Sequence, residues 1–358
     1  MFLAINTRFW LRGVAALLGS TDPDAWLRAL ADREVISGPR EGRFPGEAEY
    51  GFQHALVREA AYGMLTESDR SLGHQLAATW LEDRGEGDAM VLAEHFERGG
   101  EPERAVAAYA RAAAQAFEGH DLEAALARAR RGIDCFSRTL EGSTNDDAAT
   151  RDLSLLGELF ALEAQVRRWR GENVEAERAG DAAMRRLSPG CAAWCDAAGE
   201  VVVAGAKLGH TDRILDVAAR LGALPEGCSI TGARVTAMTR AAVYLRLAGE
   251  TARAEAMLDH AVALAQLVPG DPVASAQVES SRASRALAAG DLGDYLRRLE
   301  ASREQLEEAG DSRGACTRGL NVGYAHLQLG DAAQAERVLR DVLAEAERLG
   351  LQNVRTYA

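Results

Sequence analysis

The segment NVGYAHLQLGD, residues 321–331, followed by Ala335, decides how this chain folds. Gly330 lies where an apolar helical pattern ends, and glycine closes a helix at low cost because it adopts the left-handed backbone conformation. Asp331 then falls in the first turn of a second helix, where its charge complements the helix dipole. Small residues on both sides, Gly323 before the glycine and Ala335 after it, allow the two helices to approach closely. The segment therefore predicts a helical hairpin with a tight turn, here called an elbow.

The same arrangement recurs along the chain at a step of roughly 40 residues, which is typical of repeat proteins. The residue after the glycine is usually acidic, as in Gly249-Glu250, and a small residue often follows the glycine by five positions, as Ala254 does. Each hairpin of such an array buries its apolar face only by stacking on its neighbours, and the result is an elongated binding surface. The elbow glycines are Gly171, Gly209, Gly249, Gly290 and Gly330.

A second kind of turn separates one hairpin from the next. Most of these turns contain proline, which cannot continue a helix and restricts the residue before it. Elbows and looser turns alternate from about residue 148 to the end of the chain, and the helices between them should have about 18 residues and a length of about 27 Å. The looser turns lie at 189–190, 225–227, 269–272 and 310–311.

The segment 321–331, with Ala335 and Leu339, resembles a tetratricopeptide repeat. That family has a glycine and an aromatic residue in the first helix, then an alanine and a large apolar residue four apart in the second. The resemblance implies an all-α fold, a right-handed solenoid of antiparallel hairpins. The chain departs from the pattern, because Ile214 and Tyr295 replace the alanine and no repeat has the family's first-helix tryptophan. Its period is also nearer 40 than 34 residues. We interpret it as the longer-helix variant found in bacterial signalling ATPases, with a generic helical solenoid as the alternative.

The first 70 residues, approximately, are not repeats. We expect a short helix from about Phe9 to Leu18, a second starting at Asp22-Pro23, one small β-hairpin between about residues 35 and 52, and a third helix over 52–62. Two helices, a hairpin and a helix resemble the winged-helix lid that closes the nucleotide-binding module of STAND-type signalling ATPases. The join that follows, which includes His74 and Ala93-Glu94-His95-Phe96, resembles large bacterial serine/threonine kinases, notably myxobacterial ones. In those proteins a kinase domain is followed by an ATPase and a tetratricopeptide tail.

These resemblances predict three parts. A winged-helix-like lid with one β-hairpin covers residues 1–66, a helical adaptor with irregular repeats covers 67–147, and the repeat array covers 148–358. A polar loop at 142–147 should divide the adaptor from the array. The front begins within a lid that has no ATPase to close, and the last elbow, at Gly350, starts a helix that stops at Ala358. We therefore expect the C-terminal portion of a larger signalling protein, truncated at its own C-terminus.

Composition limits the possible partners. The chain has 358 residues, 47% of them hydrophobic, and a net charge of −13, which argues against nucleic acid because such binding depends on neutralising phosphates. No apolar run approaches the 18 or so residues that cross a bilayer, and the start lacks a secretory pattern, so no membrane partner is expected. Five scattered cysteines include Cys191 and Cys195, which have no second pair to complete a zinc site. We expect reduced thiols and a cytoplasmic location.

The sequence contains no motif of an ATP-binding or kinase site. Its one lysine, Lys207, lies in GAKLGH (205–210) rather than in a phosphate-binding loop, and the His-Arg-Asp and Asp-Phe-Gly motifs of a kinase are missing. We therefore expect no catalytic residue, no cofactor and no metal site. His54 is a weak candidate for contact with a nucleotide, because a winged-helix histidine reaches the nucleotide in the broader ATPase family. The alternative is a capping or core histidine beside Phe52 and Arg58.

Interaction or sensing is thus the expected function. The alternatives are a fragment of a serine/threonine kinase or ATP-binding regulator whose catalytic domains lie outside the chain, and the tail of an ATP-dependent transcriptional regulator. In tetratricopeptide arrays the first helix of each hairpin lines the concave face, which would bind a protein, a peptide, an effector, or the ATPase or kinase domains of the parent protein.

Counting back from the elbow glycines gives candidate partner-binding residues on that face. Aromatic and arginine side chains usually carry most interface energy, which favours Trp169, Arg246 and Tyr324, although the two aromatic residues also suit core positions. The candidates are Gln165, Arg168, Trp169, Lys207, Thr239, Arg246, Gln277, Ser284, Tyr324 and Gln328.

Overall fold

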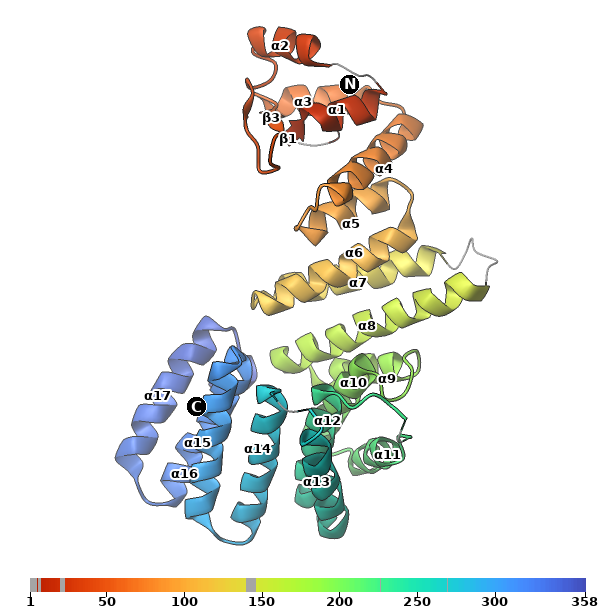
Figure 1. The fold of residues 1–358 in the computed structure, drawn as a ribbon. Coiled ribbons are helices and arrows are strands. Elements are labelled where there is room, and N and C mark those ends of the chain that lie inside the picture. Colours follow the sequence, from red (N-terminus) through yellow and green to blue (C-terminus); the bar gives the residue numbers. More distant parts are fainter. Residues whose placement is uncertain (1–4, 6–7, 20–22, 140–145, 226, 269) are drawn as a thin grey trace. The chain divides into compact units, whose positions relative to one another are not determined.

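A computed structural model describes residues 5, 8–19, 23–139, 146–225, 227–268 and 270–358 (Figure 1). The chain divides into two compact units, unit 1 with Met1–Ala112 and Arg131–Thr144 and unit 2 with Ala113–Arg130 and Asn145–Ala358. The division passes through the hairpin of α6 (Pro102–Glu118) and α7 (Leu122–Thr139). The predicted polar loop at 142–147 lies outside the described residues up to 145, and a helix begins at Asp146.

Unit 1 begins with a three-stranded antiparallel sheet in the order β1-β3-β2. Strands β2 and β3 form the predicted hairpin. Strand β1 was not predicted, because the expected first helix started at Phe9, whereas Phe9 pairs with Tyr50 of β3 and the helix begins two residues later. The apolar run continues from the strand into the helix, so its periodicity does not separate them. The bounds are β1 (Arg8–Trp10), α1 (Leu11–Leu18), α2 (Asp24–Asp32), β2 (Arg40–Glu41), β3 (Ala48–Gly51) and α3 (Ala55–Gly63).

An aromatic cluster joins the sheet of unit 1 to the next helix, α4 (Glu67–Asp83). The rings of Trp10 and Trp80 stack with centroids 5.4 Å apart, and the Phe44 ring meets both edge-on, at 4.8 and 5.6 Å. Next to this cluster the carboxylate of Glu47, itself buried, lies 3.2 Å from a guanidinium nitrogen of Arg84. Large aromatic contacts thus hold the small sheet on α4. The winged-helix identity of this part stays a prediction.

Two buried histidines connect α4 to α5 (Ala89–Arg98). The Tyr62 hydroxyl lies 2.9 Å from Nε2 of His74, whose Nδ1 lies 3.0 Å from Nδ1 of His95. If Tyr62 donates to Nε2, then His74 donates to His95, and both rings are neutral. Burial, together with the neighbouring His95 and Arg98, lowers the pKa of His74 to about 3, and burial with Arg98 lowers the pKa of His95 to about 4.

This pair should make unit 1 sensitive to acid. Both histidines bind protons near pH 6.5 when unfolded but only near pH 3–4 when folded, so stability is full above about pH 6.5 and falls as the pH drops towards 4. The expected loss approaches about 1.4 kcal/mol per pH unit for each histidine. Hydrogen exchange of α4 and α5, corrected for intrinsic rates, should show this loss between about pH 7 and about pH 5. It should be smaller in a His74→Gln/His95→Gln variant, while His260→Gln, at an exposed position, should behave as wild type. Equal acid sensitivity in all three proteins would contradict the assignment.

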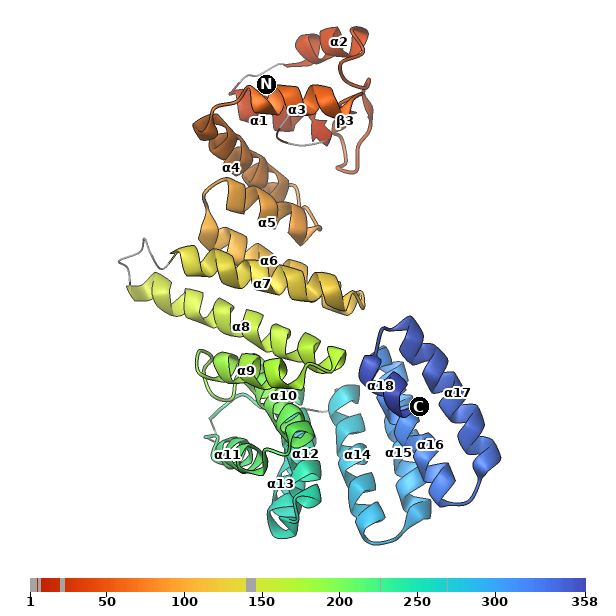
Figure 2. The ribbon, with the colours of Figure 1, turned by 180° about the vertical axis from the view of Figure 1, so that it is seen from behind.

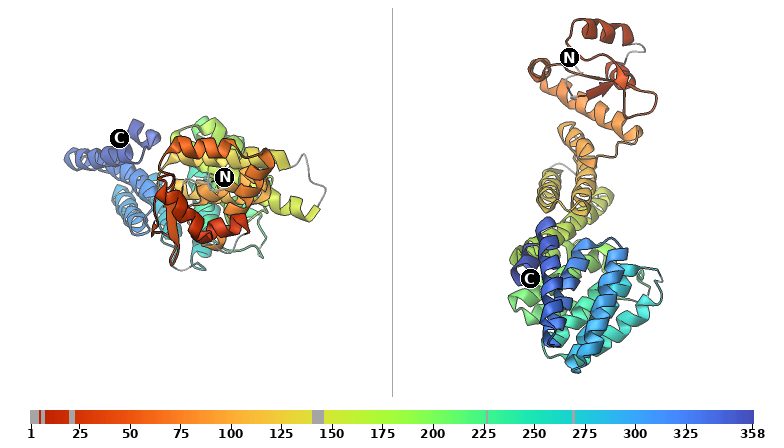
Figure 3. Two further views of the ribbon diagram at one scale, coloured as in Figure 1. Left: turned by 90° about the horizontal axis from the view of Figure 1, so that it is seen from above. Right: turned by 90° about the vertical axis from the view of Figure 1, so that its left-hand side faces the viewer.

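Unit 2 is an array of antiparallel helical hairpins, and Figure 3 shows α14 to α17 as neighbours in two views. All five predicted elbow glycines have positive φ, from 76° at Gly209 to 86° at Gly249. The helices have 12–17 residues from α9 to α17, shorter than expected. The bounds are α8 (Asp146–Arg170), α9 (Asn173–Met184), α10 (Ala192–Leu208), α11 (Thr211–Gly222), α12 (Gly232–Leu247), α13 (Thr251–Ala265), α14 (Pro272–Ala288), α15 (Leu292–Glu308), α16 (Ser312–Gln328), α17 (Ala332–Arg348) and α18 (Gln352–Tyr357).

Each elbow glycine ends one helix, and at Gly290 and Gly330 the aspartate that follows it caps the next helix. At Gly330 the backbone N–H of Asp331 donates to the carbonyl oxygen of His326 at 2.9 Å, which is the long bond of a Schellman cap. The Asp331 side chain then accepts from the backbone N–H of Gln334 at 3.1 Å and so caps α17. The elbow at 119–121 has the same hydrogen bonds, but His120 rather than Gly119 takes the left-handed conformation, with φ 63°.

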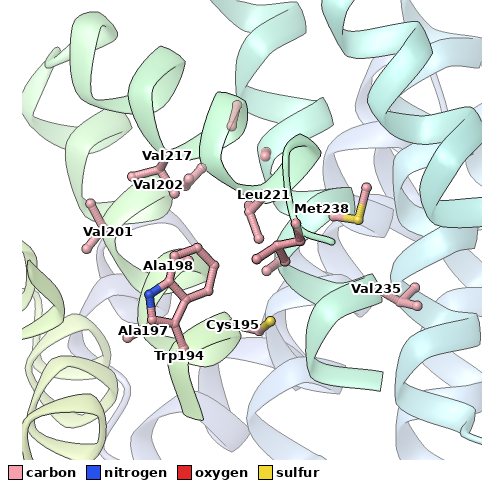
Figure 4. Packing of buried hydrophobic residues seen from close by; sticks show 14 of the residues in the cluster. Trp194, Cys195, Ala197, Ala198, Val201, Val202, Val217, Leu221, Val235 and Met238 are labelled. Atoms are coloured by element: carbon pink, nitrogen blue, oxygen red, sulfur yellow. The ribbon is translucent and has the colours of Figure 1, made fainter. Parts of the chain in front are cut away.

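The main core of unit 2 lies between α9 and α14 (Figure 4). Trp194 is fully buried and its indole N–H donates to the carbonyl oxygen of Met184 at 3.2 Å. Figure 4 shows Val202 and Val217 from the two helices of one hairpin in the same cluster. Alanines fill the closest approaches, and the predicted small positions Ala254 and Ala335 have no exposed surface. Over the described residues, no helix is long and apolar enough to cross a membrane.

Replacement of Ala335 by phenylalanine should force the last full hairpin apart. Ala335 has no exposed surface in α17, and overpacking of such a site costs about 1–3 kcal/mol. The melting temperature of Ala335→Phe should therefore fall. Ala333→Phe, which places the same side chain at an exposed position of the same helix, is the control and should melt with the wild type. Identical melting of the two variants would show that the packing at this elbow is misassigned.

Candidate functional site

The first helices of successive hairpins line one cavity in unit 2, with a volume of about 320 Å³. Each helix lines the cavity with a different part of its length. These parts are the C-terminal ends of α8 and α10, the middle of α12, and the N-terminal halves of α14 and α16. The short last helix, α18, completes the wall. We call this the concave cavity, and its lining residues include Arg168, Trp169, Lys207, Thr239, Arg240, Tyr244, Gln277, Ser280, Asp311, Thr317, Arg318, Asn321, Asn353 and Tyr357.

The cavity is bounded because the last helix of the array contacts the first. Helix α18 packs against both α16 and α8, and Figure 2 shows it beside α16. Asn353 of α18 donates through its side-chain amide to the carbonyl oxygen of Arg168, at 2.7 Å. This contact needs a glycine at 171, because a Cβ there would lie 2.7 Å from the Asn353 amide oxygen. The elbow glycine between α8 and α9 thus also provides space for α18.

A buried carboxylate connects three first helices at the wall of the cavity. Glu200 of α10 is 2% exposed; one of its oxygens accepts from Arg240 of α12 at 2.8 Å, and the other accepts from Nε of Arg168 of α8. Burial raises the pKa of Glu200, and the two guanidinium groups more than reverse this, so the pKa ends below its ordinary value. The carboxylate therefore stays ionised at neutral pH.

Arg318 of α16 differs from these paired arginines. Among the described residues it has no hydrogen-bond or ion-pair partner, and its Nε atom is buried and unsatisfied. Burial lowers the pKa of Arg318 to about 10, with a smaller contribution from the charge of Arg240. The guanidinium group is still charged at neutral pH. A cationic group thus lines the cavity without a counter-charge in contact with it.

Lys207 lies at the C-terminal end of α10, where the cavity meets α18. Its ammonium group lies 5.2 Å from the centroid of the Tyr357 ring, within the range of a cation–π contact. Because Lys207 is the one lysine of the chain, its amine is a chemically unique group on this surface.

The structure brings five of the ten candidate residues together in the lining of the concave cavity: Arg168, Trp169, Lys207, Thr239 and Gln277. These five side chains differ in how free they are to contact a ligand. The hydroxyl of Thr239 is used within its own helix, where it donates to the carbonyl oxygen of Val235 at 3.0 Å. Trp169 is half-buried and packs against two apolar clusters, with the Arg168 guanidinium 4.0 Å from its ring centroid.

The other five candidates, Gln165, Arg246, Ser284, Tyr324 and Gln328, do not line the cavity. Arg246 forms an ion pair with Glu255 at 2.7 Å, and its side chain is only 10% exposed. Tyr324 is exposed and its hydroxyl donates to the carbonyl oxygen of Tyr357 at 2.6 Å. Arg246, Ser284, Tyr324 and Gln328 lie nearer their elbow glycines than the cavity-lining residues of α12, α14 and α16 do, whereas Gln165 lies farther from its elbow than Arg168 and Trp169.

The lining residues that were not predicted from the sequence include Arg240, Arg318, Tyr244, Asn321, Asn353 and Tyr357. Arg240 and Arg318 could have been predicted from the sequence. A charged residue in the interior of a helix that packs on both sides must either pair with another group or face a cavity. Asn353 and Tyr357 had none, because their role depends on α18 meeting α8.

The remaining sequence candidates do not form a site. His54 is exposed at the N-cap position of α3, and its side chain makes no capping hydrogen bond. The hypothesis that it contacts a nucleotide stays untested. Within the described part of the chain, no three His, Cys, Asp or Glu side chains are grouped in a way that could hold a metal ion. All five cysteines are free thiols, and burial raises the pKa of Cys195 to about 12.

A comparison with models of known protein families found no match, and a comparison with curated proteins also found none. A solved structure similar to this chain is the Signal Transduction ATPase with Numerous Domains (STAND) protein with a tetratricopeptide repeat sensor, PH0952, from Pyrococcus horikoshii. The match covers 99% of this chain and 51% of that one, at 13% identity and a TM-score of 0.50. BtubC (BKLC) from P. vanneervenii matches 64% of this chain and 92% of its own, at 16% identity and a TM-score of 0.43.

The fold is therefore an all-α, tetratricopeptide-like solenoid preceded by a small domain with an antiparallel sheet. Its likeness to PH0952 extends over nearly the whole chain, and the chain spans about half the length of that protein.

Removal of the Glu200 carboxylate should destabilise unit 2 strongly. Glu200→Ala leaves Arg168 and Arg240 without their counter-charge, and the loss of one partner from a buried ion pair costs about 3–5 kcal/mol. Urea unfolding followed through the fluorescence of buried Trp194 should report the loss. Glu336→Ala removes an exposed pair with Arg340 and should change stability by less than about 1 kcal/mol. A Glu200 variant no less stable than this control would mean that the carboxylate is not structural.

Proposed function

We propose that this chain is the sensor and interaction region of a larger signal-transducing ATPase or serine/threonine kinase, and that it binds a protein or an effector in the concave cavity. The observation that carries the proposal is the lining of that cavity by side chains from separate repeats, from α8 to α18. A ligand there touches both ends of the array. Binding would therefore stabilise the arrangement in which α18 contacts α8.

Two further observations support this function. PH0952 is described as a STAND protein with a tetratricopeptide repeat sensor, and it is about twice the length of this chain. The segment that follows the first 66 residues resembles, in sequence, the corresponding segment of bacterial kinases with an ATPase and a repeat tail. We assign these residues no catalytic role. We also propose a cytoplasmic location, which the free thiols support, and no nucleic-acid partner, because the net charge is −13.

The unique lysine provides the test. A partner or effector in the concave cavity should slow acetylation of Lys207, which mass spectrometry can follow as one site. Fractions of a cell extract, protein and small-molecule separately, are screened for this protection. Any protecting component is then tested against a Gln277→Ala/Asn321→Ala variant, and its affinity should fall by about tenfold or more, since the variant removes two amide groups from the lining.

Gln334→Ala/Arg337→Ala is the matched control, because it removes an amide and a charge from α17, outside the cavity lining, and should bind as wild type. A component that binds the wild type while leaving Lys207 fully reactive, and that binds the cavity variant equally well, would place the interaction elsewhere.

A further inference from the structure

The charged side chains that line the concave cavity are mostly cationic. Arg168, Lys207, Arg240 and Arg318 face it, against one acidic lining residue, Asp311. This balance is opposite to that of the whole chain, whose net charge is −13. The cavity is thus a local cationic site on an acidic protein, which favours anions over neutral or cationic molecules.

The acidic groups around the cavity are already used or do not reach Arg318. Glu200 is shared between Arg168 and Arg240. A side-chain oxygen of Asp311 accepts from the backbone N–H of Gly314 at 2.9 Å and so caps α16. Asp196 of α10 does not line the cavity, and burial raises its pKa to about 6, against an opposing effect of Arg240. Among the described residues, Arg318 is therefore the arginine of the lining that has no ion-pair partner. Lys207 also lacks a carboxylate partner, but its ammonium group contacts the Tyr357 ring.

An unpaired guanidinium group beside a cavity is costly to the empty protein. A buried charge is normally paired, and a buried Nε without an acceptor adds a further penalty. A ligand oxyanion would supply the missing counter-charge, because the planar fork of arginine donates two parallel hydrogen bonds to a carboxylate or a phosphate. Such a ligand is chemically what this site lacks.

We propose that the concave cavity binds a small organic anion whose carboxylate or phosphate group pairs with Arg318. This inference rests on the proposed function and narrows its ligand class. A volume of about 320 Å³ lies within the range of small-molecule sites and exceeds a single oxyanion, so the ligand has an organic part as well. Tyr244, Gln277 and Asn321 offer it a ring and two amides from three helices.

The experiment uses the full chain, reductively methylated with ¹³C, so that Lys207 gives the one lysine signal and keeps its charge. Inorganic pyrophosphate and citrate are titrated separately at constant ionic strength, with trehalose as a neutral control. We expect saturable shifts of the Lys207 signal, with a Kd below about 1 mM for at least one anion, and a higher Tm of unit 2. A response to pyrophosphate alone indicates phosphorylated ligands, and a response to citrate alone indicates carboxylates.

Arg318→Gln should weaken the responding anion by at least about tenfold, whereas Arg337→Gln, an exposed charge on α17, should leave it unchanged. Without ligand, Arg318→Gln should be as stable as the wild type or more so, because it removes a half-buried charge that has no ion-pair partner among the described residues. Should it not fold, Arg318→Lys serves instead and should also weaken binding, since an amine cannot form the two parallel bonds.

Two results would overturn the inference: no saturable response to either anion, or a response that Arg318→Gln leaves intact. The proposed function would survive both results if another component still protects Lys207 from acetylation. It would fail separately if nothing that binds the chain protects that lysine.

Discussion

The carboxylate of Glu200 is the interaction on which the wall of the concave cavity depends. Two charged oxygens far from solvent are tolerable only because each is paired, one with a guanidinium group from the preceding first helix and one with a guanidinium group from the following first helix. This arrangement sets the distance between α8, α10 and α12 at the level of the cavity. The three side chains, Glu200 and its two arginine partners, together carry one net positive charge. The ionised carboxylate thus holds the wall together, and the excess of one arginine over it leaves the wall cationic.

The elbows could be predicted because their cause is local. A left-handed glycine closes one helix, and the next helix starts within three residues, whatever surrounds the turn. The positive φ at Gly249 and Gly290 follows from that chemistry. The buried alanine at 254 follows from the same turn, since two helices that leave a tight elbow must be close there. The strand β1 had no such local sign. Phe9 and Trp10 belong to an apolar run that suits either a strand or a helix, and pairing with β3 decides between them.

The helices that line the concave cavity could be predicted, but the part of each helix that lines it could not. Counting back from the elbows found the cavity in the first repeats, where Arg168 and Lys207 lie beside their glycines. In the later repeats the lining lies nearer the helix N-termini, at Gln277 and Arg318. That displacement depends on the summed packing of all hairpins. Closure by α18 depends on it too, since Asn353 meets α8 only after the array has turned back on itself.

Arginine suits the half-buried position 318 better than lysine would. Arginine begins with a pKa high enough that burial of Arg318, which lowers the value to about 10, leaves the group charged at neutral pH. The amine of a lysine has an ordinary pKa of about 10.4. The same burial would bring that pKa close to neutral pH, and the amine would lose part of its charge. The single lysine lies where this cost is absent, on the exposed rim beside Tyr357. A cationic cavity inside an acidic solenoid can therefore be built from arginine at the interior positions, and lysine suits only its edge.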